Sequence, residues 1–240
     1  MLTGPQFSAD AAAANLRKTL AETRTRIASA ALRCGRAPDS VGLLAITKGQ
    51  PVQMVRAAAE LGQLDFGENY LQEAIPKLSA LADVPLRWHY TGQIQSNKTR
   101  PIAERFEWVH TVDRERIAVR LSEQRPHHAP PLNICVQIRL ADEPGKGGVA
   151  PGEVLELIRR VNVLPRLKLR GLMCIPPPLQ TFEEQHAALR QVADCLAQVN
   201  SQGYALDTLS MGMSADLEAA IAAGATWVRV GTAIFGERLA

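Results

Sequence analysis

One lysine of this sequence, Lys48, stands where a side-chain amine could act as a nucleophile. It directly follows the apolar run 41–47, which has the length of a buried strand, and period-two alternation places it on one face with Leu44 and Ile46. Burial at a strand end disfavours the charged ammonium, and an uncharged amine attacks carbonyl carbons. A lone lysine in such a position is more often a solvated side chain, so the interpretation depends on residues elsewhere in the chain.

Two turns near the end of the chain combine glycine with a hydroxyl group, as phosphate sites do. The turn Ser210-Met-Gly-Met-Ser214 follows one apolar run, and Gly231-Thr232 follows the next. Ser214 is expected to cap the helix after its turn, and the backbone N–H groups at a helix start favour an anion. Either turn alone is more often an ordinary capped helix or glycine turn, but the two together predict a phosphate site.

The last apolar run, Trp227-Val-Arg-Val-Gly231, contains a charged residue. Its two valines share one face of the expected strand, and Arg229 lies on the other. If Arg229 faces the interior, its fixed positive charge needs an acceptor, which a ring nitrogen or an acid would supply. A nucleophilic lysine, a phosphate site and this arginine together describe a site for pyridoxal 5′-phosphate.

Other arrangements of reactive residues are weaker. The five histidines show no HxxxH or HExxH spacing, so no metal site is expected, and His89 is interpreted as a hydrogen-bonded core residue. The sequence contains no GxSxG or GxxxxGK[ST] motif, which leaves hydrolase and NTPase functions unsupported. Lys146, in a glycine-rich loop, is most often a solvated charge, and the alternative is a second amine or phosphate contact.

Short apolar runs alternate with helical patterns along most of the chain, and this order predicts an α/β fold. Eight strands, each followed by a helix, favour a single (β/α)8 TIM barrel domain over residues 1–240, with an open doubly wound sheet as the alternative. Active sites of such barrels lie at the C-terminal ends of the strands, where Lys48 and the two turns fall. The expected strands are 41–47, 64–67, 86–90, 107–112, 132–138, 167–173, 206–210 and 227–231.

An additional helix is expected before the first strand, so that residues 1–38 would pack on the barrel. Residues 9–34 have apolar side chains at the spacing of one helical face, namely Leu16, Leu20, Ile27 and Ala31.

Local signals mark the starts of several later helices. Asp113 is placed to cap the helix after the fourth strand, and Pro151 is expected in the first turn of another. Thr181 and Glu184 form a capping-box pattern before a long helix.

The composition is that of a soluble globular protein, with 46% hydrophobic and 21% charged residues and a net charge of +3. No basic stripe is interleaved with aromatic residues, so nucleic acid is not an expected partner. No run approaches the roughly 20 apolar residues that span a membrane. The four cysteines are scattered without a CxxC pair, which favours a reducing compartment. The expectation is a cytoplasmic protein, and the small size without an apolar surface stripe favours a monomer.

The resemblance to a known family is carried by six segments spread over most of the chain, namely 44–48, 66–70, 88–98, 171–176, 209–214 and 228–236. Together they resemble the pyridoxal-phosphate homeostasis protein family. The resemblance implies a barrel like the N-terminal domain of alanine racemase, with pyridoxal 5′-phosphate held as a Schiff base on Lys48. It also implies a role in the intracellular homeostasis of this vitamin B6 cofactor, without established enzymatic turnover and with apo-enzymes as possible recipients.

The same resemblance assigns roles to individual residues. One departure is Gln50, which stands where the family usually has a second lysine, so a relay role for that amine is in doubt here. The implied site residues are Lys48 for the covalent bond, Ser214, Gly231 and Thr232 for the phosphate, Arg229 for the pyridine nitrogen, and Asn69 and Met211 beside the ring.

An amino-acid racemase of the alanine racemase type is the main alternative function. Such an enzyme needs a second acid–base group, which a separate β-domain supplies in the resembling enzymes, and the sequence after the eighth strand is expected to be too short for one. The tyrosines Tyr70, Tyr90 and Tyr204 have no evident placement for this task. A further alternative is a barrel that binds another phosphorylated metabolite without a covalent bond.

Overall fold

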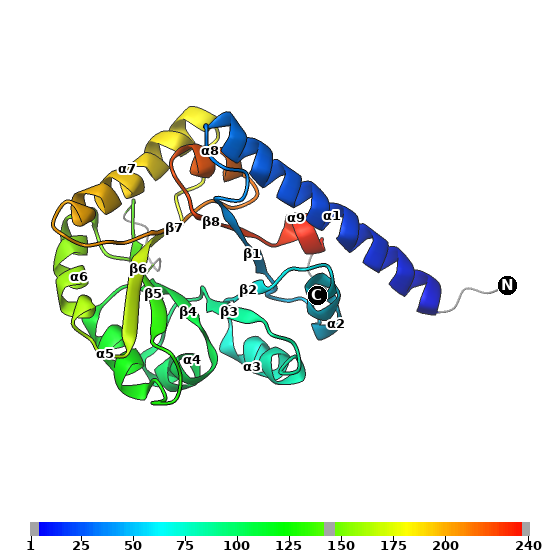
Figure 1. The fold of residues 1–240 in the computed structure, drawn as a ribbon, viewed down its shortest axis with the longest axis horizontal. Coiled ribbons are helices and arrows are strands. Elements are labelled where there is room, and N and C mark those ends of the chain that lie inside the picture. Colours follow the sequence, from blue (N-terminus) through cyan, green and yellow to red (C-terminus); the bar gives the residue numbers. More distant parts are fainter. Residues whose placement is uncertain (1–4, 142–146, 237–240) are drawn as a thin grey trace.

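Eight parallel strands close into a barrel in the computed structural model, which describes residues 5–141 and 147–236. Each strand pairs with the next, and β8 returns to pair with β1 (Figure 1). The predicted TIM barrel is therefore confirmed, and the open-sheet alternative is wrong because the sheet closes on itself. The strands are β1 Gly42–Ile46, β2 Asp65–Glu68, β3 Arg87–Tyr90, β4 Trp108–Val112, β5 Leu132–Ile138, β6 Leu167–Cys174, β7 Thr208–Ser210 and β8 Trp227–Val230.

Helices surround the barrel and cover the outward faces of its strands (Figure 1). Outward side chains such as Phe66, Val109, Ile134 and Val228 are fully buried beneath them. The helices are α1 Pro5–Arg33, α2 Val52–Glu60, α3 Leu71–Ala80, α4 Thr99–Arg105, α5 Glu115–Gln124, α6 Val154–Asn162, α7 Phe182–Asn200, α8 Leu217–Ala222 and α9 Thr232–Phe235, with short 3₁₀ helices η1 Ser96–Lys98 and η2 Pro151–Glu153.

The long helix α1 packs along the side of the barrel against α2, α8 and α9. Side-chain contacts help to hold it there. Arg26 forms a double ion pair with Glu218 of α8 at 2.6 Å, and the Thr19 hydroxyl donates to the carbonyl of Ile234 in α9 at 2.6 Å. The four apolar residues of the predicted face are all buried, namely Leu16, Leu20, Ile27 and Ala31.

The helix-start signals were partly right. In the capping box before α7, the Glu184 amide donates to the Thr181 hydroxyl at 3.2 Å and the Thr181 amide donates to the Glu184 carboxylate at 3.1 Å. Pro151 does begin a helical turn, the 3₁₀ turn that leads into α6.

Two predicted caps are wrong. Asp113 does not cap α5, because its carboxylate is paired with Arg114, the residue that precedes the helix, at 2.6 Å. Ser214 does not cap α8, which begins only at residue 217. The carboxylate of Asp216 instead accepts a hydrogen bond from the amide of Met213 at 2.6 Å and closes the turn before the helix starts.

The barrel interior is unusually polar for this fold. Interiors of TIM barrels are usually filled by Val, Ile and Leu. Here polar side chains that are less than a tenth exposed point inward from separate strands, and they include Asp65, His89, His110, Ser210 and Arg229. Departures from the usual pattern tend to mark functional sites.

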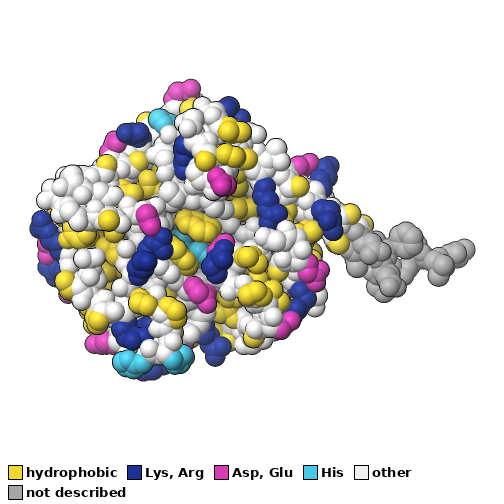
Figure 2. All heavy atoms as spheres, viewed as in Figure 1, with side chains coloured by type: hydrophobic (Ala, Val, Ile, Leu, Met, Phe, Trp, Pro, Cys, Tyr) yellow, Lys and Arg dark blue, Asp and Glu magenta, His cyan; other side chains and the backbone are white. Residues whose placement is uncertain are grey.

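On the face in Figure 2, Lys and Arg side chains lie among Asp and Glu side chains. Among the residues described, no helix is long and apolar enough to cross a membrane. In the same part of the chain, no group of three His, Cys, Asp or Glu side chains could hold a metal ion.

Candidate functional site

A cavity of about 350 Å³ opens at the C-terminal ends of the strands. It lies where TIM barrels carry their active sites, and its size is within the range of small-molecule pockets. The apolar part of its lining includes Ile46, Met173 and Ile175. The predicted site residues that line it are Lys48, Asn69, Ser214, Arg229, Gly231 and Thr232.

Met211 is the predicted site residue that the structure does not bring to this cavity. Its side chain is fully buried in the hydrophobic core outside the barrel. The methionines that line the cavity are Met173 and Met213 instead. The reason is strand alternation, because Ser210 faces the interior and the next residue along therefore faces outward.

Lys48 is held at the rim by a tight turn after β1. The residue is half-buried, and Gly49 beside it has φ +71°, a backbone conformation that favours glycine. The Gly49 amide donates to the carboxylate of Glu73, on α3, at 2.7 Å. The turn thus fixes the backbone that carries the amine.

A buried ion pair between α3 and β2 also contacts the backbone of this turn. Lys77, on α3, donates to the carboxylate of Glu68 at 2.7 Å and to the carbonyl of Thr47 at 2.6 Å. The Thr47 hydroxyl also donates to Glu68, at 2.6 Å. Burial raises the pKa of Glu68, and the hydrogen bonds from Lys77 and Thr47 partly offset that rise. Sequence reasoning missed this pair, because only the fold brings α3 beneath the end of β1.

Arg229 faces the interior of the barrel, which is one of the two orientations that the sequence left open. One guanidinium nitrogen, Nη1, donates to the Ser210 carbonyl at 2.6 Å and to its hydroxyl at 3.1 Å. The other, Nη2, donates to the carbonyl of Cys174 at 2.8 Å. Burial lowers the pKa of Arg229 from the usual arginine value. These contacts hold the guanidinium at the floor of the cavity.

Two buried histidines continue from Ser210 across the barrel. Nδ1 of His110 lies 2.8 Å from the Ser210 hydroxyl, and its Nε2 lies 2.9 Å from Nδ1 of His89. Nε2 of His89 lies 3.1 Å from the carboxylate of Asp65. The interpretation of His89 as a hydrogen-bonded core residue is confirmed. The roles of the other three were missed, because alternation places each on one face of an expected strand but does not say which face is the interior.

The two hydroxyl-bearing turns meet at the side of the cavity next to β1. Gly212 has φ +96°, and a Cβ there would lie 2.5 Å from the Cβ of Ala220, so this position requires glycine. Gly231 immediately precedes α9, and a Cβ on it would lie 3.1 Å from the carbonyl oxygen of Ile46. Backbone N–H groups in the first turn of a helix have no acceptor within the helix. Together with the hydroxyls of Ser214 and Thr232 they form a donor set that fits a phosphate.

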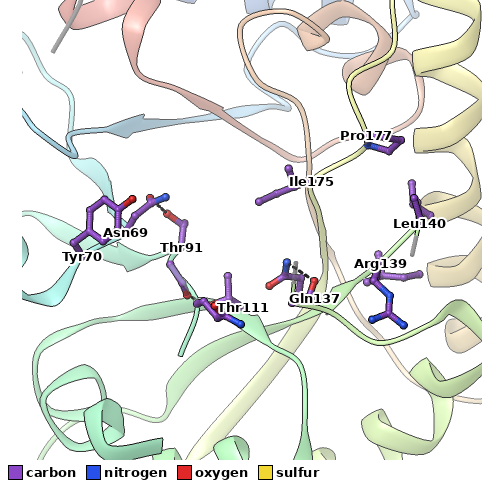
Figure 3. A pocket seen from close by; sticks show the side chains of 14 residues that line it. Asn69, Tyr70, Thr91, Thr111, Gln137, Arg139, Leu140, Ile175 and Pro177 are labelled. Carbon is purple, nitrogen blue, oxygen red and sulfur yellow. Dashed lines mark hydrogen bonds between the residues drawn. The ribbon is translucent and has the colours of Figure 1, made fainter. Parts of the chain in front are cut away.

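A second cavity of about 330 Å³ adjoins the first and shares Asn69, Thr91 and Ile175 with it. In Figure 3, Asn69 and Thr91 lie on one side of this space, and Gln137 and Arg139 lie on the other. The Thr91 hydroxyl donates to the side-chain oxygen of Asn69 at 2.9 Å, which orients the amide at the border between the cavities.

The tyrosines differ in their relation to the mouth. Tyr70 is exposed and lines the second cavity. Tyr90 is buried, donates to the carbonyl of Gln93 at 3.3 Å, and has its pKa raised to about 12 by burial, which makes it a poor acid–base group. Gln50 is buried beside the Lys48 turn. Lys146 lies outside the described residues.

Comparison with known proteins shows that the chain is similar to one family of barrel proteins. The family model for the alanine racemase N-terminal domain matches residues 20–239. A pyridoxal phosphate homeostasis protein of Pseudomonas aeruginosa is 55% identical over 221 residues, which cover 92% of this chain and 95% of that protein. One from Escherichia coli is 49% identical over 222 residues, covering 91% of this chain and 95% of that protein.

Solved structures agree with the sequence comparison. The PipY protein of Synechococcus elongatus, with pyridoxal phosphate bound, has a TM-score of 0.82 at 37% identity, covering 92% of this chain and all of that one. An alanine racemase of Clostridium difficile has a TM-score of 0.70 at 13% identity, a likeness of fold alone, and the match covers 84% of this chain and 56% of the racemase.

Proposed function

The chain belongs to the pyridoxal phosphate homeostasis proteins, within the alanine racemase N-terminal domain family, and from this premise we propose that it binds pyridoxal 5′-phosphate through Lys48. Its role is to carry or regulate that cofactor in the cell. The observation that supports the proposal most strongly is the meeting of Lys48, Arg229 and the phosphate donor set in one cavity. Lys48 is far in the sequence from the other two features, which both lie within residues 214–232.

The residues of the cavity match the parts of the cofactor. The Lys48 amine is placed to react with the aldehyde of the cofactor, because an amine and an aldehyde form an imine. The hydroxyls of Ser214 and Thr232, with the backbone at Gly231, bind the phosphate. Asn69 and the apolar lining lie beside the ring.

We propose further that Arg229 faces the pyridine nitrogen and that the protein is a carrier rather than an enzyme. A guanidinium holds its proton firmly, so it donates a hydrogen bond to the nitrogen without protonating it. An unprotonated ring withdraws electrons weakly, and carbanion chemistry on a bound amino acid is then disfavoured. We place the protein in the cytoplasm as a monomer, with apo-enzymes that use the cofactor as possible recipients.

The visible absorption spectrum of the purified protein tests the covalent bond. We expect an absorption band from the bound cofactor, and borohydride reduction followed by peptide mapping should give a pyridoxyl adduct on the Lys48 peptide. Lys48→Ala should lose both signals, and Lys168→Ala, a change of an exposed lysine on β6, should keep both. An adduct on another lysine, or a colourless wild-type protein after incubation with the cofactor, would contradict the proposal.

Amino-acid racemisation is the competing function, and the likeness to alanine racemase motivates a direct test. Incubation of the loaded protein with single enantiomers of several amino acids should leave their optical purity unchanged. Sustained conversion that Lys48→Ala abolishes would establish the racemase instead.

A further inference from the structure

The hydrogen-bonded chain through the barrel interior runs from Arg229 to Asp65, and its donors and acceptors have one consistent order. Asp65 is an acceptor, because hydrogen bonds from His89 and Arg87 outweigh its burial and keep its pKa below the usual value. Nε2 of His89 therefore donates to it. Burial lowers the pKa of His89, so the ring is neutral and its Nδ1 can only accept.

The donor and acceptor roles can be assigned in the same way from His89 towards the cavity. Since Nδ1 of His89 accepts, Nε2 of His110 is the donor at 2.9 Å. His110 is also neutral, because burial lowers its pKa well below the usual value, so its Nδ1 accepts the hydroxyl proton of Ser210 at 2.8 Å. The oxygen of that hydroxyl then has its lone pairs directed at Arg229, whose Nη1 donates to it at 3.1 Å.

We propose that His110 and Ser210 are positioning residues for Arg229, and that Asp65 sets the direction of the whole chain through His89. The proposal rests on the proposed function, since it concerns the arginine that faces the cofactor ring. The chain turns the Ser210 hydroxyl proton away from the cavity and its oxygen towards the guanidinium. Arg229 is thereby held in one orientation, with a hydrogen bond left for the pyridine nitrogen.

This arrangement also explains why the barrel interior contains buried polar groups in place of the usual aliphatic layers. A buried polar group costs free energy unless it is hydrogen-bonded, and here each member has a partner on either side. Trp108 packs over both imidazoles, with ring centroids 5.4 Å from His89 and 5.7 Å from His110, and helps to fix their planes.

The test compares variants along the chain in the cofactor-loaded protein. Ser210→Ala removes the hydroxyl but keeps the backbone carbonyl that Arg229 also uses. His110→Phe removes both hydrogen bonds of the imidazole, whereas His110→Asn restores an acceptor near the position of Nδ1. Val109→Ala, on the outward face of the same strand, is the control for general loosening of β4.

Two readouts are the ¹⁵N chemical shift of cofactor labelled at the pyridine nitrogen and the dissociation constant of the cofactor. Ser210→Ala and His110→Phe should move the resonance away from its wild-type position and raise the dissociation constant about threefold to tenfold, the factor of one lost hydrogen bond. His110→Asn should return the resonance most of the way to the wild-type position. Val109→Ala should leave the resonance in place.

The outcomes separate this inference from the function on which it rests. A wild-type protein with no bound resonance and no adduct on Lys48 overturns the proposed function, and the inference with it. A loaded wild-type protein whose resonance and affinity are unchanged by Ser210→Ala overturns the inference alone. If Val109→Ala shifts the ¹⁵N resonance as much as Ser210→Ala does, the inference is likewise overturned. If His110→Phe fails to fold, Ser210→Ala decides.

Discussion

At the scale of single residues, the two cationic side chains of the site are held in different ways. Lys48 is half-buried on a turn at the rim, where an amine can meet an aldehyde. Arg229 is buried and fixed by backbone carbonyls and the Ser210 hydroxyl, so it is suited to hold a ring rather than to react. The neutral histidines behind it, His89 and His110, make its surroundings sensitive to acid.

The buried histidines predict a fall in stability on mild acidification. Burial lowers the pKa of both His89 and His110, so the unfolded chain binds protons below about pH 6.5 that the folded protein does not. Stability is therefore greatest above this pH and is lost as the pH falls below it. Urea unfolding at pH 7.5 and 5.5 should show a loss of about 1 kcal/mol for each histidine.

The matched variants are His110→Asn, which should remove about half of this pH dependence, and His128→Asn, an exposed change that should leave it intact. An unaltered slope in His110→Asn would show that the imidazole is not held neutral.

Gly231 predicts a specific loss of cofactor affinity. A Cβ at this position would lie 3.1 Å from the carbonyl oxygen of Ile46, so Gly231→Ala should push the phosphate turn away from β1. We expect the dissociation constant of the cofactor to rise about tenfold, which corresponds to the loss of about one charge-assisted hydrogen bond. Gly152→Ala, where the added carbon meets nothing within 4 Å, should leave fluorescence-titrated affinity unchanged. Equal affinities for the two variants would contradict the close-approach argument.

At the scale of elements, α3 is the support of the Lys48 turn. Its residues Glu73 and Lys77 contact the backbone on either side of Lys48, through the Gly49 amide and the Thr47 carbonyl. The helix thus links the end of β1 to the end of β2 through the buried ammonium group of Lys77.

Removing the buried charge should cost much more than removing an exposed one. Lys77→Met leaves the Glu68 carboxylate buried without its ion-pair partner, which typically costs about 3–5 kcal/mol. The expected result is a lower urea midpoint of unfolding. Lys18→Met, which breaks an exposed pair with Glu22, should change stability by less than about 1 kcal/mol. A small effect of Lys77→Met would show that Glu68 takes up a proton at little cost.

At the scale of the whole molecule, α1 connects parts of the barrel that are far apart in sequence. It packs on α2, near the start of the barrel, and on α8 and α9, near its end. The Thr19 hydroxyl also donates a hydrogen bond to the carbonyl of Ile234 in α9, the helix that begins directly after Gly231. The helix therefore stabilises the junction at which β8 meets β1.

Truncating the buried face of α1 should destabilise the entire fold. Leu20 is 1% exposed, and Leu20→Ala should lower the free energy of unfolding by about 3 kcal/mol. Unfolding followed by tryptophan fluorescence and by far-UV circular dichroism should give one shared transition. Leu32→Ala, at a residue of the same helix that is 60% exposed, is the control and should change stability by less than about 0.5 kcal/mol. Separate transitions by the two probes would mean that α1 unfolds independently.

The order of apolar runs and helical patterns was enough to predict the barrel, and the position of Lys48 directly after the first expected strand was enough to place it at the barrel mouth. Alternation also set Arg229 on the face opposite its two valines, but it left open which face is the interior. That choice depends on how β8 pairs with β1 and β7, because closure of the sheet decides which side is enclosed.

Tertiary structure alone decided the remainder of the site. Met211 was expected beside the ring, yet it packs outside the barrel, and Ser214 was expected to cap a helix that begins three residues later. The contact between His110 and Ser210 joins residues 100 positions apart, and no local pattern encodes the strand register that brings them within 2.8 Å. Periodicity along one strand is a local property, whereas contacts across a closed barrel depend on the register and tilt of every strand between them.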